Sequence, residues 1–399
     1  MDLNEFSGLR MTYIGQSIAD GTGVGGSARL KNMVSIFRRL AIRIDMISFS
    51  FYSDSFKIET TIIDDSLQIT MIHIPGNLNR LVKAFAIFPV FIYGISSSKK
   101  SDIIFSDFIT EIAYLPAVLL GSIFHKPVIL DYIDTKFFKF IPHSINKFAA
   151  QRADLIFAIS HYLEDFCKTE YKCKKVIYLP IFIDTDLFKM DLKLRNEMRE
   201  KLRIEENEIV IGYAGAFASW EGLPILLKAF KSLSEKYTNI KMAIMGKVYA
   251  IGDESIEKLV NDIGLSSDKM ILIPSQPYES VPYFLSAFDI LCCPKLDCEI
   301  NRAANPIKVV EYLSMGLPSV CSSVGGILDT IQDKHDGLLV KPGDPLDLEQ
   351  KLEWIILNPD KAKNLGKCGR EKAIRYYSLE AIEGLIRTAL YDICNNQTE

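Results

Sequence analysis

Short apolar runs alternate with helical patterns along almost the whole chain. In the first half, runs rich in β-branched and aromatic residues occupy 11–15, 44–49, 69–74, 102–106, 127–132, 154–160 and 175–180. In the second half, similar runs occupy 209–215, 241–246, 269–274, 290–294, 318–323 and 337–340. Continuously apolar strands that alternate with helices are typical of parallel sheets covered on both faces. The pattern therefore predicts an α/β protein.

The alternation is interrupted once, by a charged helical stretch at 189–207. We therefore expect two doubly wound, Rossmann-like domains in series, at 1–188 and 189–377. A last helical segment, 378–399, follows after the second domain is complete. We expect this segment to pack back on the first domain.

Composition and charge narrow the function classes. The chain has 399 residues, of which 48% are hydrophobic and 24% are charged, as in globular proteins. The net charge of −4 argues against general nucleic-acid binding. Residues 29–152 hold 15 Lys and Arg against 10 Asp and Glu, a local charge of +5, so the rest of the chain carries −9. This asymmetry suggests that the first half faces an anionic surface or substrate.

Cysteine use and hydropathy bear on the location of the protein. The eight cysteines show no CxxC spacing, and no signal-peptide pattern opens the sequence, so we expect a reduced, cytoplasmic setting. The most apolar stretch, 81–95, is too short to span a bilayer, which needs roughly 20 residues. With Arg80 and Lys83 near its start and Lys99 and Lys100 after it, the stretch suits an interfacial helix, and a core helix explains it equally well.

The stretch NPIKVVEYLSMG, at 305–316, predicts a helix with unusual chemistry in its first turn. Asn305 is a good N-cap, Pro306 suits the first helical position, and Gly316 ends the helix. Lys308 opposes the helix dipole by about 0.3–1 kcal/mol unless a negative group lies beside it. A bound phosphate would remove this conflict. The stretch therefore predicts an anion site.

Glu311 lies on the same helical face as Ile307 and Lys308, one turn further on. Its carboxylate suits two hydrogen bonds from a ribose diol, so a nucleotide diphosphate site is one interpretation. An ordinary surface pair of Lys308 and Glu311 explains the segment equally well.

Glycine loops follow strands in both halves, as nucleotide-binding sites at the carboxyl ends of parallel strands require. Gly25 and Gly26 precede a helix in the first half, and Gly215 and Gly246 end strands in the second. A cleft between the two domains is the expected active site.

A dinucleotide fingerprint is a competing interpretation of the first glycine loop. Gly21, Gly23 and Gly26 match GxGxxG, and Asp45 follows at about the required distance. The context argues against it, because five residues separate the strand from Gly21 and Asp45 lies inside a strand pattern.

The motifs of both halves, taken in order, resemble those of the retaining glycosyltransferases of family 4, which have the GT-B fold. The second half carries the resemblance in IGYAGAFASWEGLPILLKAF, PIKVVEYLSMGLPSVCSSVGG and DGLLVKPGD, and the first half in QRADLIFAISHYLEDF and KVIYLPIFIDTDLF. The resemblance covers nearly the whole chain. It implies two Rossmann-like domains that face each other across a cleft and transfer of a sugar from a UDP-sugar or GDP-sugar.

The resemblance also implies roles for individual residues. Glu311 would bind the ribose, and the Lys308 ammonium with the amides of residues 307–309 would face the diphosphate. The residues implied on the donor side are Gly25, Gly215, Lys247, Asn305, Ile307, Lys308, Val309 and Glu311, and 273–278 would lie near the nucleobase.

Asp131 and Asp134 match a DxxD-like stretch of relatives and would line the acceptor side, although capping of the next helix is an alternative role. Asp134 and Gly26 are the candidates for the catalytic centre.

Two departures from the family pattern affect the donor site. Relatives often have a glutamate eight residues before the ribose-binding one, where this chain has Ala303. Asn305 or Glu299 would have to replace this glutamate, so the identity of the donor sugar is left open. Many relatives also have a basic pair where this chain has GAFASWEG with Glu221. Lys308, assisted by Lys247 or Arg302, is then expected to offset the phosphate charge.

The implied chemistry needs no protein nucleophile and no metal, because the departing diphosphate takes the acceptor proton and the protein supplies positioning and charge. The five histidines are scattered, and we interpret them as structural. The expected acceptor is a cell-surface glycan or a lipid-linked molecule at the inner face of the cell membrane, with peripheral contact through the basic first domain. A nucleotide-sugar epimerase and a catalytically silent nucleotide-sugar-binding subunit are the alternatives.

Overall fold

The computed structural model describes residues 6–16, 25–133, 142–248 and 255–395. The chain divides into two compact units, of which the first comprises Met1–Pro180 with Ile382–Glu399 and the second Ile181–Ala381. The sequence analysis placed these transitions at 188/189 and 377/378.

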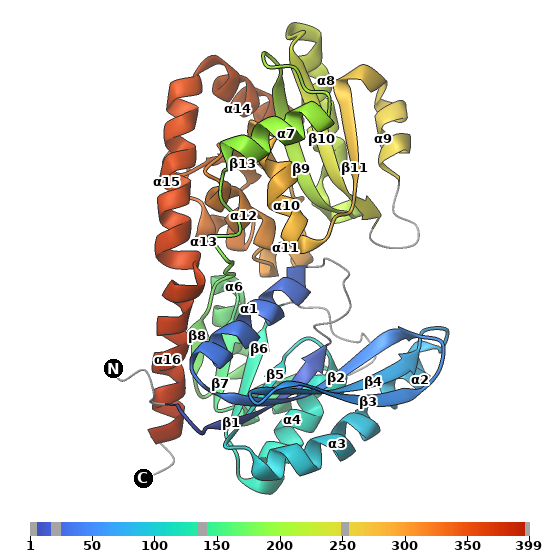
Figure 1. The fold of residues 1–399 in the computed structure, drawn as a ribbon, viewed down its shortest axis with the longest axis vertical. Coiled ribbons are helices and arrows are strands. Elements are labelled where there is room, and N and C mark those ends of the chain that lie inside the picture. Colours follow the sequence, from blue (N-terminus) through green and yellow to red (C-terminus); the bar gives the residue numbers. More distant parts are fainter. Residues whose placement is uncertain (1–5, 17–24, 134–141, 249–254, 396–399) are drawn as a thin grey trace. The chain divides into compact units, whose positions relative to one another are not determined.

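The first unit is built on an eight-stranded sheet in the order β3-β4-β2-β1-β5-β6-β7-β8 (Figure 1). All of its described pairs are parallel except β3 with β4, which form an antiparallel hairpin at one edge. The strands are β1 (Arg10–Gln16), β2 (Arg43–Ser53), β3 (Lys57–Asp64), β4 (Leu67–Pro75), β5 (Ile103–Asp107), β6 (Val128–Tyr132), β7 (Leu155–Ala158) and β8 (Val176–Tyr178).

Helices cover both faces of this sheet. In Figure 1, α3 and α4 lie side by side on one face and α1 lies on the other. The helices of this unit are α1 (Gly25–Arg39), α2 (Arg80–Ala84), α3 (Ile87–Lys100), α4 (Glu111–Phe124), α5 (His143–Arg152) and α6 (His161–Phe166), and a π-helical turn follows at Cys167–Tyr171. The apolar run 81–95 therefore forms α2 and most of α3.

The second unit contains a six-stranded parallel sheet in the order β11-β10-β9-β12-β13-β14. Its strands are β9 (Ile209–Phe217), β10 (Ile240–Val248), β11 (Met270–Pro274), β12 (Ile290–Cys293), β13 (Ser319–Ser322) and β14 (Leu338–Val340). Its helices are α7 (Leu192–Lys201), α8 (Leu223–Lys236), α9 (Ile256–Ile263), α10 (Val281–Ser286), α11 (Glu299–Ala303), α12 (Ile307–Met315), α13 (Gly326–Thr330), α14 (Pro345–Leu357) and α15 (Pro359–Tyr377). The two sheets confirm the α/β prediction, and every strand predicted from the apolar runs is present.

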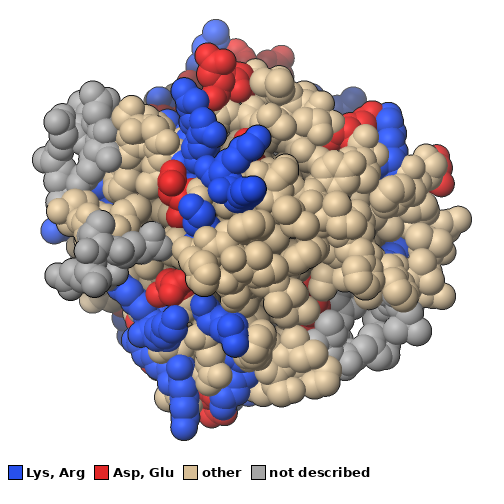
Figure 2. Space-filling model, turned by 90° about the horizontal axis from the view of Figure 1, so that it is seen from below, with Lys and Arg blue, Asp and Glu red and all other residues tan. Residues whose placement is uncertain are grey.

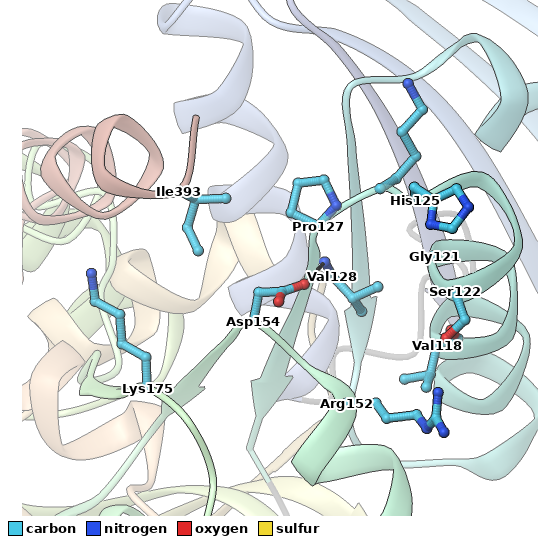
Figure 3. Close-up of a pocket in the computed structure, with 11 residues that line it drawn as sticks. Val118, Gly121, Ser122, His125, Pro127, Val128, Arg152, Asp154, Lys175 and Ile393 are labelled. Atoms are coloured by element: carbon cyan, nitrogen blue, oxygen red, sulfur yellow. Dashed lines mark hydrogen bonds between the residues drawn. The ribbon is translucent and has the colours of Figure 1, made fainter. Parts of the chain in front are cut away.

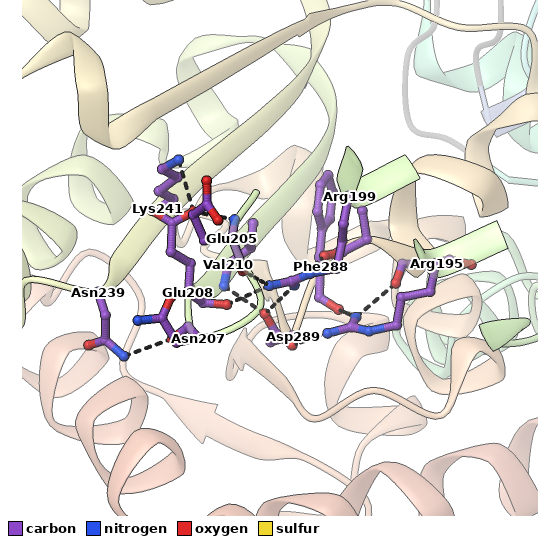
Figure 4. A network of polar contacts seen from close by, with 12 residues as sticks. Arg195, Arg199, Glu205, Asn207, Glu208, Val210, Asn239, Lys241, Phe288 and Asp289 are labelled. Carbon is purple, nitrogen blue, oxygen red and sulfur yellow. Dashed lines mark hydrogen bonds and ion pairs between the residues drawn. The ribbon is translucent and has the colours of Figure 1, made fainter. Parts of the chain in front are cut away.

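A polar network fixes α7 against the amino ends of β9 and β12 (Figure 4). The carboxylate of Asp289 accepts hydrogen bonds from Arg195 at 2.5 Å and from the Val210 amide at 2.8 Å. Arg199 adds a bond to Asp289 at 3.2 Å and another to the Glu208 carbonyl at 2.7 Å. The network therefore holds α7 and the amino ends of β9 and β12 together.

The last helix, α16 (Leu379–Asn395), belongs to the first unit from Ile382 onward. There, Lys175 forms an ion pair with Asp392 of α16 at 2.8 Å. Among the described residues, no helix has the length and apolar content to cross a membrane.

Candidate functional site

The site expected at the start of α12 lies at the carboxyl end of β9. Helix α12 begins at Ile307, its N-cap residue is Pro306, and no side chain caps it. The prediction that Asn305 caps the helix was wrong by one residue. Asn305 is instead buried, and its side chain accepts a hydrogen bond from Thr330 at 3.3 Å. The Val309 amide, one of three expected to face a diphosphate, donates to the Pro306 carbonyl at 3.0 Å.

Lys308 is buried and has an acidic partner. Its ammonium donates to Glu221 Oε2 at 2.7 Å and to the Tyr213 hydroxyl at 3.0 Å. It also lies 4.4 Å from the centre of the Tyr213 ring, a cation–π contact. The unfavourable position of a lysine in the first helical turn is thus offset by a carboxylate of the protein itself. A phosphate is not needed to explain Lys308.

Glu221 holds a second lysine as well. Lys295, just after β12, donates to Glu221 Oε1 at 2.7 Å and to Asn301 Oδ1 at 2.9 Å. Burial opposes ionisation of Glu221, but Lys308 and Lys295 outweigh it and lower its pKa to about 2. The two ammonium groups and one carboxylate leave one net positive charge at the start of α12. We call Glu221, Lys295 and Lys308 the lysine–glutamate cluster.

Glu311 lies one turn after Lys308 and is also buried. Burial raises its pKa to about 7, although Lys308 and the Tyr278 hydroxyl act in the opposite direction. A carboxyl group held in this way gains stabilisation from any hydroxyl donors that reach it, because it has lost most of its hydration. The arrangement suits the ribose role expected for Glu311, which stays a prediction.

The glycines of the second unit allow backbone and side chains to approach closely. A Cβ atom at Gly215, in β9, would collide with the Lys308 ammonium. A Cβ atom at Gly246, which pairs with Gly215 in the neighbouring β10, would collide with the Gly215 carbonyl. Gly215 therefore leaves room for the Lys308 ammonium, and Gly246 allows the two strands to approach closely at their carboxyl ends. Lys247 is exposed at the end of β10.

The remaining candidates of the second unit have ordinary surroundings. Arg302 forms an exposed ion pair with Asp297 at 2.6 Å, Glu299 is exposed at the start of α11, and Ala303 is buried. Ile307 is half-buried.

Asp131, in the first unit, forms a buried bidentate pair with Arg29 of α1. Arg29 Nε donates to Oδ2 at 2.9 Å and Nη2 to Oδ1 at 2.8 Å. Arg29 also donates to the Pro180 carbonyl at 2.7 Å. Both carboxylate oxygens of Asp131 thus have a partner that joins α1, β6 and the end of the unit, and this gives Asp131 a structural role beside the expected acceptor role.

Gly25 and Gly26 are the first two residues of α1. Asp134 lies outside the described residues, as do Gly21 and Gly23 of the competing glycine motif.

Comparison with known proteins places this geometry in context. Residues 195–372 match the family model of the glycosyl transferases group 1. An uncharacterized glycosyltransferase MJ1178 of Methanocaldococcus jannaschii is 24% identical over 60% of this chain and 60% of its own length. The alpha-D-kanosaminyltransferase of Streptomyces kanamyceticus is 24% identical over 64% of this chain and 66% of its own length. A GDP-mannose-dependent phosphatidylinositol monomannoside mannosyltransferase of Mycolicibacterium smegmatis is 22% identical over 56% and 58%. The chain thus spans between 46% and 60% of the length of the first curated relatives that it matches.

Solved structures show the fold. Sucrose-phosphate synthase of Thermosynechococcus elongatus superposes with a TM-score of 0.74 and 17% identity, over 96% of this chain and 98% of that one. HepE of Anabaena in complex with UDP gives a TM-score of 0.73 and 17% identity, over 96% and 100%. The expected GT-B class and the recognised resemblance to group 1 glycosyltransferases are confirmed.

Proposed function

We propose that this chain, of which residues 195–372 match the family model of the glycosyl transferases group 1, is a retaining glycosyltransferase of the family 4 type that uses a nucleotide diphosphate sugar. The donor is a UDP-sugar or a GDP-sugar. Support comes from the relatives, because one is named as GDP-mannose-dependent and HepE is solved with UDP.

The observation that carries the proposal is that the buried carboxyl group of Glu311 lies one helical turn from Lys308, a member of the buried and positively charged lysine–glutamate cluster. Glu311 and Lys308 both lie on α12, where parallel strands end, as nucleotide sites in doubly wound folds do. The net charge of the lysine–glutamate cluster suits a diphosphate, and the Glu311 carboxyl suits the ribose diol. One short helix thus offers complementary groups for both parts of a nucleotide.

In the proposed reaction, the bond between the anomeric carbon and the diphosphate oxygen breaks, and the acceptor oxygen forms the new bond on the same face of the sugar. The departing diphosphate oxygen takes the acceptor proton. Lys308 and Lys295 stabilise the negative charge that grows on the leaving group, and Glu221 holds both ammonium groups in place. No protein nucleophile and no metal ion are required by this route.

We propose a cell-surface glycan or a lipid-linked molecule as the acceptor, handled at the cytoplasmic face of the membrane. The first unit would contact this membrane peripherally. The basic excess of residues 29–152 supports this part of the proposal.

A silent nucleotide-sugar-binding subunit is the second candidate. It is favoured by one observation, the contact between Glu221 and Lys308, because this carboxylate already neutralises one of the two lysines available for a diphosphate.

The experiment is incubation with a panel of UDP- and GDP-sugars, with and without a membrane extract as the source of acceptor. Release of nucleoside diphosphate that depends on the extract supports the proposal. Binding of a nucleotide sugar without turnover would support the silent subunit, and an epimerised donor would contradict both.

A further inference from the structure

Helix α3 carries apolar side chains on an outer side that no described part of the chain covers. Its inner side is buried through Val90, Gly94 and Ser98. The opposite side carries Phe88, which is 59% exposed, and Ile92, which is 61% exposed. These two residues are one helical turn apart and form a continuous stripe. A helix of a globular protein normally points polar side chains outward, so the exposed stripe requires an explanation.

The apolar stripe extends onto the neighbouring helices. Phe85, just after α2, is 64% exposed and stacks on Phe88 with ring centres 6.0 Å apart. On α4, which packs beside α3, Leu119 and Ile123 are also exposed. We call Phe85, Phe88, Ile92, Leu119 and Ile123 the apolar face.

Basic side chains border the apolar face. Residues 76–101 hold four Lys and Arg and no Asp or Glu, and Lys99 and Lys100 are exposed at the end of α3. From the side on which α3 and α4 lie in Figure 1, Figure 2 shows a broad uncharged area, with most of the Lys and Arg, and some Asp and Glu among them, along one side of it.

A hollow of about 470 Å³ lies beside α4 at the amino end of β6 (Figure 3). Lys126, Arg152 and Lys175 line it. Asp154, which also lines it, accepts a hydrogen bond from the Val128 amide at 2.9 Å. Lys175 is already paired with Asp392 at 2.8 Å, so Lys126 and Arg152 stand against the single lining carboxylate of Asp154, and this excess of positive charge suits an anionic headgroup.

We propose that the apolar face and its basic border dock on an anionic lipid bilayer, with Phe85, Phe88 and Ile92 inserted at the level of the headgroups. This inference deepens the proposed membrane contact of the glycosyltransferase and rests on it. The charge pattern selects the partner, because an anionic surface attracts the basic border while the apolar side chains leave water. A second copy of the chain would bring two basic borders together, which is unfavourable.

The test is sedimentation of the full chain with vesicles of phosphatidylcholine alone and of phosphatidylcholine mixed with phosphatidylglycerol. The wild type should sediment with the mixed vesicles only, and less at high salt, since screening shortens the range of the attraction. Lys99→Glu with Lys100→Glu should weaken the partition at least 10-fold, because one lysine near an anionic surface contributes about fivefold. Phe88→Ser with Ile92→Ser should abolish sedimentation, because the side chains that leave water on docking are removed.

The matched control is Leu346→Ser with Leu357→Ser on α14, where the leucines are 59% and 63% exposed. This variant should sediment like the wild type. Equal sedimentation of all variants, or none by the wild type, would overturn the proposal. So would a dimer that forms without lipid and that the Phe88 and Ile92 changes dissociate. Sugar transfer to a water-soluble acceptor, measured in parallel, separates loss of docking from failure of the proposed enzymatic function.

Discussion

Replacement of Glu221 by Gln removes the carboxylate that holds Lys295 and Lys308 together. The shape of the side chain is nearly kept, so packing should change little. Two buried ammonium groups would then face each other without their shared counter-charge. Removal of one partner from a buried ion pair is strongly destabilising for this reason.

The pKa of Glu221 gives the magnitude. Its folded value of about 2 lies below the ordinary 4.5, so ionised Glu221 stabilises the fold by about 3 kcal/mol at neutral pH. Because the folded pKa is depressed, this contribution is present above pH 4.5 and is lost as the pH falls toward 2. The Glu221→Gln variant should therefore be about 3 kcal/mol less stable at pH 7, and the difference should shrink at pH 3.5.

Urea unfolding of wild type and variant at both pH values measures this difference. Glu349→Gln is the matched control, because Glu349 pairs with Lys236 at 2.8 Å but that lysine is half exposed. The control should cost at most about 1 kcal/mol. A Glu221→Gln protein as stable as the wild type at pH 7 would refute the interpretation of the cluster as a buried, charged unit.

Three further predictions follow from single contacts. Burial raises the pKa of Glu311 to about 7, so nucleoside diphosphate affinity measured by calorimetry should rise between pH 6 and 8 as this carboxyl group ionises. The affinity of Glu311→Gln should rise less, because only the ionisation of the ligand itself then contributes to the pH dependence. Equal pH profiles for wild type and variant would contradict the ribose role. Gly215→Ala should displace the Lys308 ammonium, lower nucleotide affinity and cost about 1–3 kcal/mol of unfolding free energy, so unchanged binding would show that Lys308 is remote from the ligand. Asp131→Asn should lower the unfolding free energy by about 3–5 kcal/mol, because Arg29 keeps its buried charge without a counter-ion; a stable variant that has lost only sugar transfer would favour the acceptor role over the structural one.

Local pattern was sufficient for most of the fold. The predicted strand 102–106, for example, is short and has a continuous apolar centre, Ile103–Phe105, between Asp102 and Ser106, so its type follows from the sequence alone. The strand Lys57–Asp64 was missed, because it lies at the edge of the sheet, most of its side chains are exposed, and it therefore lacks the apolar signal.

The candidate site was only partly accessible from the sequence. Lys308 and Glu311 stood out because they share one helical face. Lys295 was missed, since its contact with Glu221 joins residues 74 positions apart and no local pattern encodes such a pair. A second long-range contact reversed the interpretation of Lys308, because its counter-charge is Glu221 of the protein itself, 87 positions away. For Asp131, the buried pair with Arg29, 102 positions away, was equally hidden.

The most direct test of the proposed function is nucleoside diphosphate release from UDP- and GDP-sugars in the presence of membrane acceptor, with wild type and Glu311→Gln compared at pH 7.5. The account predicts release that depends on the acceptor with one donor, a product that keeps the anomeric configuration of the donor, and a large loss of rate in the variant. Donor binding without any acceptor-dependent release across the whole panel would contradict it.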